Sequence, residues 1–289
     1  MPRLAKIIVY PIKSFDGVEL SECGFVSSGA LENDRRFALR TADGKLLNAK
    51  RSERMHRLRA TFDLAAQTVT LRTGDSVPET FALAAGNPEF ERWCGDYFDV
   101  PVRFVEDTEQ GFPDDPDSPS ATIISTPTLK AVAGWFPGLD VAEVRRRFRA
   151  NLEIDSAPAS GGDAEAGEPD CPPFWEDRLF TEDAAPDTRD VVEFRIGDVT
   201  FQGTNPCMRC PVPTRDSQTG EALAGFARMF ADRRREALPS WAPRGPFDHY
   251  YRLAVNTRLG FAQQGKTIRV GDRVSLLPRG EGGDVLIDG

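Results

Sequence analysis

Residues 191–214 of the chain read VVEFRIGDVTFQGTNPCMRCPVPT, and this stretch contains the strongest signals of fold and function. Apolar and polar side chains alternate on both sides of the dipeptide Gly197-Asp198, which suits a tight turn. The pattern predicts a β-hairpin over residues 191–202. The hairpin leads into residues 205–214, where three prolines and two cysteines predict a stiff loop.

The two cysteines of this loop, Cys207 and Cys210, have the C-x-x-C spacing that three kinds of site use. Half a zinc site would need two more ligands, but the sequence has no second such pair, and His56 and His249 lie far apart. A thioredoxin-like dithiol normally lies at a helix start in a βαβ unit, whereas a hairpin and a proline-rich loop are predicted here. The third interpretation is a single thiolate that binds a soft metal.

The first part of the chain is predicted to consist of short strands separated by frequent turns, as in a barrel or sandwich. Asp43-Gly44 is a hairpin signal between two of these strands. One helix follows them, with Asn87 as N-cap, Pro88 at its first position and Cys94 on its apolar, core-facing side. The predicted strands cover residues 7–10, 18–26, 37–41, 45–48, 58–64, 68–72 and 102–105.

A stretch rich in Asp, Pro, Ser and Gly, residues 107–120, indicates a domain boundary. We therefore predict two domains, 1–118 and 119–289, which is consistent with the length of 289 residues. Residues 156–173 contain little apolar material and are expected to form a mobile insertion. Cys171, near the end of that insertion, is expected to be an exposed thiol.

The second domain is predicted to combine helices with further strands. One helix is expected to start with Thr126 as its cap, and another at Asp140, where Glu143 would complete a capping box. The arginines at 145–147 are expected to form a solvated face, because successive residues of a helix point in different directions. A long helix is predicted over 221–235. The closing strands are predicted at 252–255, 267–270 and 274–277, which gives a β-rich α+β fold.

The composition excludes several classes of function. The net charge is −9 and the isoelectric point about 5.0, so the chain lacks the basic field that nucleic-acid binding requires. An odd count of five cysteines argues against a disulfide framework. We see no apolar signal segment after Met1 and no apolar run of about 18 residues, so we expect a cytoplasmic protein without a membrane span.

Five segments carry a more specific signal, because they occur together and in a characteristic order. They are Tyr10-Pro11-Ile12-Lys13-Ser14, Asp34-Arg35-Arg36-Phe37, Phe148-Arg149-Ala150-Asn151-Leu152, Arg209-Cys210 and Gly271-Asp272-x-Val274. In this order they resemble the motifs of the MOSC family, a domain shared with the C-terminal part of molybdenum cofactor sulfurases. Within that family, the chain most resembles the mitochondrial amidoxime-reducing component and its bacterial relatives.

The resemblance implies an N-terminal β-barrel domain followed by a MOSC-type β-barrel with peripheral helices. It also implies a molybdenum cofactor, Mo-molybdopterin, in a cleft to which both domains contribute. Cys210 matches the family's metal ligand and is thus the expected catalytic residue. The other residues at positions that contact the cofactor are Lys13, Ser14, Arg35, Ser125, Thr126, Arg149, Asn151 and Arg209.

The chemistry of these residue types agrees with such a ligand. Arginine forks, lysine and the amides of a helix N-terminus bind phosphate, and a thiolate binds the metal. Other roles remain open: Lys13 and Ser14 suit a solvated turn, and Arg35 suits an ion pair with Asp34 or Glu32. The sequence does not identify a general acid, and Asp216 is a candidate by position only.

The resemblance implies reduction of small N-hydroxylated compounds such as amidoximes. The C-x₄-C-x₂-C spacing of an iron–sulfur cluster is not found, so we expect electrons from a separate protein: a ferredoxin, a flavodoxin or a cytochrome b5-like protein with its reductase. Two rival functions remain. A carrier would pass on the cofactor or sulfur without turnover, and a redox dithiol would join Cys207 and Cys210 reversibly.

Overall fold

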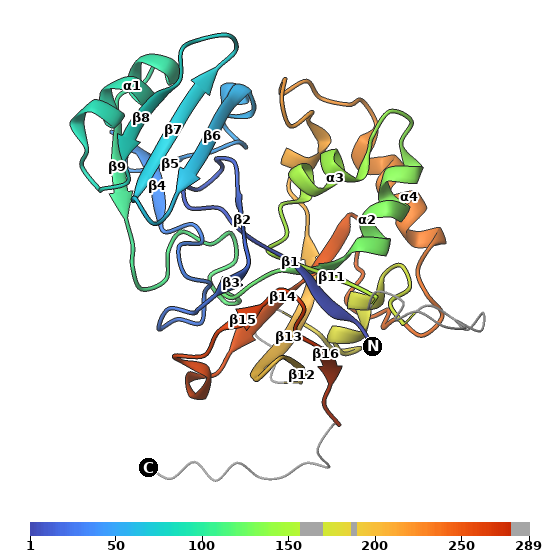
Figure 1. Ribbon diagram of the computed structural model, residues 1–289. Helices are drawn as coiled ribbons and strands as arrows, with labels where there is room; N and C mark the ends of the chain where they lie inside the picture. Colours follow the sequence, from blue (N-terminus) through green and yellow to red (C-terminus); the bar gives the residue numbers. More distant parts are fainter. Residues whose placement is uncertain (157–169, 186–189, 279–289) are drawn as a thin grey trace, which may run out of the picture.

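A computed structural model describes residues 1–156, 170–185 and 190–278, and it shows two β-rich units side by side (Figure 1). The fold is α+β and rich in strands, as predicted. The strands are β1 (Arg3–Val9), β2 (Val18–Leu20), β3 (Glu22–Cys23), β4 (Phe37–Thr41), β5 (Leu46–Leu47), β6 (Leu58–Asp63), β7 (Thr68–Thr73), β8 (Glu79–Ala82), β9 (Val102–Glu106), β10 (Ile123–Ser125), β11 (Leu152–Asp155), β12 (Val192–Ile196), β13 (Val199–Met208), β14 (Arg252–Leu259), β15 (Ile268–Arg269) and β16 (Val274–Leu276). The α-helices are α1 (Pro88–Phe98), α2 (Thr126–Trp135), α3 (Val141–Phe148) and α4 (Phe226–Glu236), and the 3₁₀ helices are η1 (Glu53–Arg57), η2 (Trp175–Leu179), η3 (Val212–Thr214) and η4 (Phe261–Gln263).

The N-terminal unit consists of two antiparallel three-stranded sheets and helix α1. The sheets have the strand orders β5-β4-β9 and β6-β7-β8, and the predicted hairpin at Asp43-Gly44 joins β4 to β5. The side chain of Asn87 accepts hydrogen bonds from the first turn of α1, and Pro88 begins the helix. Cys94 is fully buried in the core beneath this helix, as predicted.

The second unit is built on an eight-stranded sheet with the order β16-β12-β13-β14-β10-β11-β1-β2. The predicted hairpin around Gly197-Asp198 forms between β12 and β13. Strand β1 pairs antiparallel with β11, although it lies far before the predicted boundary at residue 118. Just after β1, Ile12 and Phe15 enter the core of the N-terminal unit, so this segment joins the two units.

Several predicted strands are shorter or divided. Residues 18–26, predicted as one strand, form β2 and β3, because β2 pairs with β1 whereas β3 pairs with β15 in a separate sheet. The predicted strand at 267–270 is limited to Ile268–Arg269, the two residues that pair with β3.

Helices α2, α3 and α4 lie together on one side of the second unit (Figure 1). Aromatic rings join them: Phe136 stacks on Phe226 with centroids 4.3 Å apart, and Phe148 of α3 packs against Phe230 of α4 with centroids 5.4 Å apart. Ser125, rather than Thr126, caps α2 by accepting a hydrogen bond from the Thr128 amide. Helix α4 begins at Phe226 rather than 221, because Gly225 takes a left-handed conformation with φ of 74° that α-helical turns do not tolerate.

The prediction of an exposed Cys171 is wrong. Its side chain is fully buried in the core, together with Trp175 and Leu179 of η2, which pack back against the main sheet. Burial raises the pKa of Cys171 to about 12. Most of the predicted insertion, residues 157–169, lies outside the described residues.

Two consecutive acidic residues, Glu176 and Asp177, are buried in this region. Asp177 accepts a hydrogen bond of 2.5 Å from the buried guanidinium of Arg234, which lies over the ring of Phe174. Glu176 has no such ion pair among its described contacts and accepts a bond of 3.0 Å from the hydroxyl of Thr128. Burial, with a contribution from the charge of Asp177, raises the pKa of Glu176 to about 7.

We predict that Glu176→Gln flattens the pH dependence of stability between pH 5 and 8. A raised carboxyl pKa in the folded protein stabilises the fold below the unfolded value of 4.5, and that stabilisation is lost as the pH rises through about 7. The loss amounts to about 3 kcal/mol when complete. Urea unfolding at the two pH values should show this loss in the wild type only. An identical loss in the variant would assign the effect to another group.

Candidate functional site

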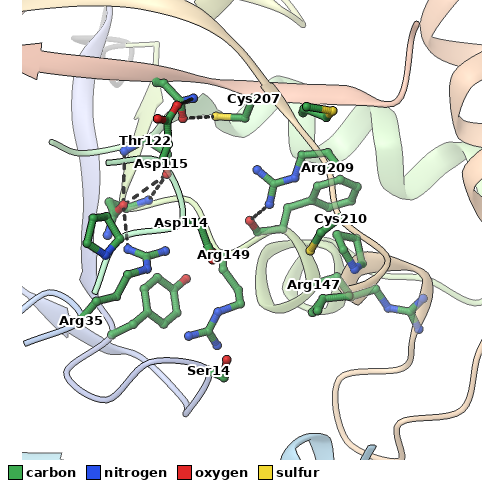
Figure 2. A pocket seen from close by; sticks show the side chains of 18 of the residues that line it. Ser14, Arg35, Asp114, Asp115, Thr122, Arg147, Arg149, Cys207, Arg209 and Cys210 are labelled. Atoms are coloured by element: carbon green, nitrogen blue, oxygen red, sulfur yellow. Dashed lines mark hydrogen bonds between the residues drawn. The ribbon is translucent and has the colours of Figure 1, made fainter. Parts of the chain in front are cut away.

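One large cavity, of about 930 Å³, lies where the two units meet, and its size suits a cofactor or small substrate. The segments that line it include the turn after β1 with Lys13 and Ser14, the loop at 113–120, the end of α3 at 145–149, and Cys210 just after the end of β13 (Figure 2). The sequence motifs at 13–14, 149–151 and 209–210, which lie far apart along the chain, therefore meet in one place.

Strand β13 carries the cysteine motif to the cavity. It continues to Met208, so residues 205–208 belong to a strand and not to the predicted loop. Its pairing with β14 is irregular on both sides of Pro206, which has no amide to donate to the ladder. Gly203 is required upstream, because a Cβ there would come within 1.8 Å of the carbonyl oxygen of Leu179.

The two cysteines of the motif have different surroundings. Cys207 is only 5% exposed, and its thiol donates a hydrogen bond of 2.7 Å to Oδ1 of Asn256. Burial raises the pKa of Cys207 to about 11, although the charge of Arg209 opposes the shift. Cys210 follows the end of β13, is partly exposed and also lines the cavity. Cys210 is therefore the more accessible of the two sulfur atoms.

Arg209, between the two cysteines, is held by backbone carbonyl groups. Its guanidinium donates hydrogen bonds to the carbonyl oxygens of Phe148 and, at 3.5 Å, Leu253, and it lies over the ring of Phe148. Its own amide donates to the carbonyl of Tyr251. These contacts fix the arginine against the end of α3 without an acidic partner among the described residues.

Arg149 lies at the point where α3 ends. It takes a left-handed conformation with φ of 53°, and its amide closes the helix by donating to the carbonyl of Arg145. Its guanidinium lies 3.9 Å from the centroid of the Tyr10 ring. Burial, with the nearby charge of Arg35, lowers the pKa of Arg149. The residue therefore presents a confined positive charge to the cavity (Figure 2).

Arg35 and Asn151 connect the units at the cavity wall. Arg35 pairs with Asp34, one of the alternatives that the sequence leaves open, and also donates a bond of 3.4 Å to Oδ1 of Asn151. The same Oδ1 accepts from the amide and hydroxyl of Thr122, each at 3.2 Å. The side-chain nitrogen of Asn151 donates to the carbonyl of Ile8 in β1. Asn151 is thus buried, and its hydrogen bonds connect Arg35, Thr122 and β1 at the place where the two units meet.

Lys13 and Ser14 reach the cavity with polar partners already in place. The Lys13 ammonium donates to the carbonyls of Phe112 and Pro113 and pairs with Asp114 at 2.9 Å. Burial lowers the pKa of Lys13, and Asp114 opposes that shift. Ser14 has a φ of 71°, and its hydroxyl accepts a bond from the amide of Ala49. The turn is ordered by these contacts and is not simply solvated.

Ser125 and Thr126 do not line this cavity. Ser125 is fully buried and its hydroxyl is engaged with Thr128 as the cap of α2. Thr126 donates instead to the carboxylate of Glu153. The start of α2 thus faces the interior of its own unit, and these two residues lie apart from the other predicted site residues.

The arginines of α3 also differ from the prediction of a solvated face. Arg145 forms a two-pronged ion pair with the buried Glu153, at 2.6 and 2.9 Å. Arg147 is buried and pairs with Glu143 at 2.6 Å. Glu143 is therefore taken up by ion pairs, and only the Asp140 half of the predicted capping box forms. Glu143 within α3 and Glu153 of β11 therefore hold these arginines beside the cavity.

Asp216, the positional candidate for a general acid, does not line the cavity. Its carboxylate accepts hydrogen bonds from the amides of Gln218 and Thr219 within its own turn. Burial acts to raise the pKa of Asp216, but these bonds outweigh it and the net shift is downward. An acid with a lowered pKa is a poor proton donor near neutral pH.

Sequence reasoning missed three residues of the cavity wall: Asp114, Asp115 and Asn256. Asp114 pairs with Lys13, and Asp115 accepts a bond of 3.0 Å from the side-chain nitrogen of Asn256. The two aspartates lie in the stretch interpreted as a linker. The sequence around these aspartates gives no signal of this role, because their partners Lys13 and Asn256 lie 101 and 141 positions away.

The residues present fit an anionic, metal-bearing ligand. Within the described residues, Nη2 of Arg149, Nη1 of Arg147 and Nε of Arg209 are buried at the cavity wall without a hydrogen-bond partner. Buried donors normally have partners, so these nitrogen atoms are available to a bound acceptor. No three His, Cys, Asp or Glu side chains of the described chain converge as a metal site, so the four protein ligands of a structural zinc are not assembled there.

We predict that Asn151→Ala lowers the free energy of unfolding by about 2–4 kcal/mol, because several buried groups lose a partner at once. The matched control is Asn48→Ala at the cavity rim, where the side chain accepts only from the nearby amide of Lys50. This control should cost less than about 1 kcal/mol. Urea denaturation of both variants provides the test, and equal losses would contradict the junction role of Asn151.

Comparison with known families identifies both units. The family model described as the MOSC N-terminal beta barrel domain matches residues 1–112, and the model of the MOSC domain matches residues 122–275. No curated protein gave a significant match to the chain. Within the described residues, none of the helices has the length and apolar character needed to cross a membrane. The second match alone spans more than half of the sequence, and the chain therefore belongs to the MOSC family, whose domains are associated with binding of the molybdenum cofactor.

Proposed function

We propose that the protein is a molybdenum-cofactor oxidoreductase that reduces N-hydroxylated compounds of the amidoxime type. The observation that carries the proposal is the meeting of Cys210, the more exposed sulfur of the motif, with Arg149 and Arg209 in one cavity between the units. Membership of the MOSC family supports the cofactor. The choice of reaction rests on the resemblance of the sequence motifs to those of the amidoxime-reducing component.

In this proposal Cys210 binds the metal as a thiolate, because sulfur ligands suit soft metals. Arg149 and Arg209 hold the anionic part of the cofactor through their unpartnered nitrogen atoms. Arg35, Lys13, Ser14 and Asn151 complete the wall and orient the ligand. Lys13 and Arg35 already have acidic neighbours, so they add less net charge than Arg149.

When bound, the cofactor supplies the two-electron chemistry that protein side chains lack. The net reaction breaks the N–O bond of the amidoxime, consumes two electrons and two protons, and yields an amidine and water. The chain's own residues bind and orient the reactants and exclude bulk water from the cavity. We further propose that the electrons come from a separate redox protein, such as a ferredoxin, a flavodoxin or a cytochrome b5-like protein with its reductase.

We predict that Cys210→Ala loses molybdenum when the chain is produced in a host that makes the cofactor. Removal of the only proposed protein ligand should lower the metal content at least tenfold, which corresponds to about 1.4 kcal/mol. Metal and pterin analysis of purified protein measures this loss. The matched control, Cys94→Ala, removes a thiol from the core of the N-terminal unit and should keep the wild-type metal content.

Turnover separates an enzyme from a carrier. We expect the wild type that contains molybdenum to convert benzamidoxime to benzamidine with a chemical electron donor, whereas Cys210→Ala should not. Product is quantified by chromatography. Wild type with full metal content and no conversion would instead favour a carrier of cofactor or sulfur, and stoichiometric molybdenum in Cys210→Ala would contradict the ligand assignment.

We predict that Arg149→Met weakens cofactor binding by about 10- to 100-fold, because a charge-assisted hydrogen bond contributes about 1.5–3 kcal/mol. Arg103→Met is the matched control, since Arg103 is exposed and pairs with Glu91 on the N-terminal unit. Retention of pterin over a series of protein dilutions gives both affinities. Equal retention in the two variants would exclude Arg149 from the binding site.

A further inference from the structure

The side-chain amide of Asn256 connects Cys207 to an acidic residue of the N-terminal side of the cavity. Its Oδ1 accepts the hydrogen bond of 2.7 Å from the Cys207 thiol. Its Nδ2 donates to Oδ2 of Asp115 at 3.0 Å and to Oδ1 of Asn205 at 3.3 Å. We refer to Asp115, Asn205 and Asn256 together as the amide network.

The chemistry of the amide network fixes the direction of each hydrogen bond. A carboxylate oxygen accepts hydrogen bonds, and the group of Asn256 that faces Asp115 is the NH₂, which donates. The carbonyl oxygen of the same amide therefore faces Cys207. An oxygen acceptor requires a donor, and a thiol can donate a hydrogen bond whereas a thiolate cannot. The orientation of the Asn256 amide therefore favours the protonated thiol of Cys207 over its thiolate.

Asp115 is itself held in place. Its Oδ1 accepts a bond of 3.1 Å from the amide of Asp117, two residues further along the same loop. Both carboxylate oxygens therefore have partners, one in the loop and one in Asn256. A carboxylate bound at both ends resists rotation, so it can restrain the amide that it contacts.

We propose that Asp115 is a positioning residue: through the side-chain amide of Asn256 it holds Cys207 as a neutral thiol. Under the proposed function, Cys210 and not Cys207 binds the metal. The state of Cys207 is a property of the protein groups alone. In the view of Figure 2, the sulfur atoms of Cys207 and Cys210 lie on either side of the Arg209 side chain.

The charged groups that face Cys207 have opposite effects. Burial has the largest effect on the pKa of the Cys207 thiol and raises it. Among the charges, that of Arg209 lowers this pKa and that of Asp115 raises it. Burial outweighs the charge and the hydrogen bond of Arg209, so the net shift of the Cys207 pKa is upward, and the side-chain oxygen of Asn256 accepts from the protonated sulfur. A thiol held in this way is also a poor nucleophile for disulfide formation with Cys210, since the thiolate is the reactive species.

Alkylation of the full chain without cofactor tests the proposal. The protein is produced in a host that does not make the cofactor and is treated with iodoacetamide at pH 7 to 10. Trypsin then separates the two thiols, because cleavage after Arg209 places Cys207 in residues 196–209 and Cys210 in residues 210–215. Mass spectrometry gives the alkylation rate of each peptide. At pH 8 we expect Cys207 to react at least about tenfold more slowly than Cys210, as its thiolate is scarce.

Variants of Asp115 separate positioning from burial. In Asp115→Ala the amide of Asn256 keeps only the longer bond of 3.3 Å to Asn205, which restrains it less. It can then turn and donate to the sulfur, so the apparent pKa of Cys207 should fall by at least about one unit and its rate at pH 8 should rise about tenfold. Asp115→Asn keeps an oxygen that accepts from Asn256, and it should restore slow alkylation. The matched control is Asp117→Ala, which removes an exposed negative charge from the same loop and should leave the rate within about threefold of the wild type.

Two results would overturn the proposal. Equal alkylation rates and pH profiles for Cys207 and Cys210 in the wild type would show that Cys207 is not held as a neutral thiol. Equal acceleration in Asp115→Ala and Asp115→Asn would assign the effect to charge and not to the amide. If Asp115→Ala does not fold, Asp115→Ser replaces it, because the serine hydroxyl is too short to reach Asn256. Slow Cys207 alkylation, combined with no molybdenum in wild-type protein from a host that makes the cofactor, would keep this inference and reject the proposed function.

Discussion

The pairing of β1 with β11 determines where the two units meet, and the cavity depends on it. Strand β1 lies within the eight-stranded sheet of the MOSC domain, whereas Phe15, a few residues later, is buried in the core of the N-terminal unit. Asn151 reinforces this junction by bonding to the carbonyl of Ile8 and to Thr122. The same junction brings the guanidinium groups of Arg35 and Arg149 over one aromatic ring, that of Tyr10. Neither unit could assemble this arrangement by itself.

The electrostatics of the cavity contrast with those of the whole chain, which has a net charge of −9. Acidic residues around the cavity mostly act locally: Asp34 pairs with Arg35, and Glu153 pairs with Arg145. These pairs hold arginines in a partly buried environment where isolated charges would be costly. Arg149 and Arg209 have no acidic partner among the described residues, so their charges are available to an anionic ligand. An acidic protein can therefore bind an anionic ligand through a few confined cations.

Short-range patterns in the sequence predicted the fold well. Turn dipeptides located the hairpins at Asp43-Gly44 and Gly197-Asp198, and the cap of α1 was placed correctly. The motifs at Lys13, Arg35, Arg149 and Cys210 identified residues that do converge on the cavity. The errors concern burial and partners across long distances. The ion pair between Arg145 of α3 and the buried Glu153 of β11, and the packing of η2 that buries Cys171, both depend on tertiary structure and have no local signature. Asp115 was missed for the same reason, because its partner, Asn256, lies 141 positions away.

Three residues of the cavity wall, Ser14, Arg35 and Arg149, have left-handed backbone conformations with φ of 71°, 50° and 53°. For residues with a side chain this conformation costs about 1–2 kcal/mol each, whereas glycine adopts it freely. Glycine at these positions would relieve that strain but would remove the hydroxyl or guanidinium group that the cavity presents. The backbone strain therefore lowers the stability of the fold at the cavity wall, where these polar side chains are located. Engineering for heat resistance should leave these three positions unchanged and seek its gains in the sheets of the N-terminal unit.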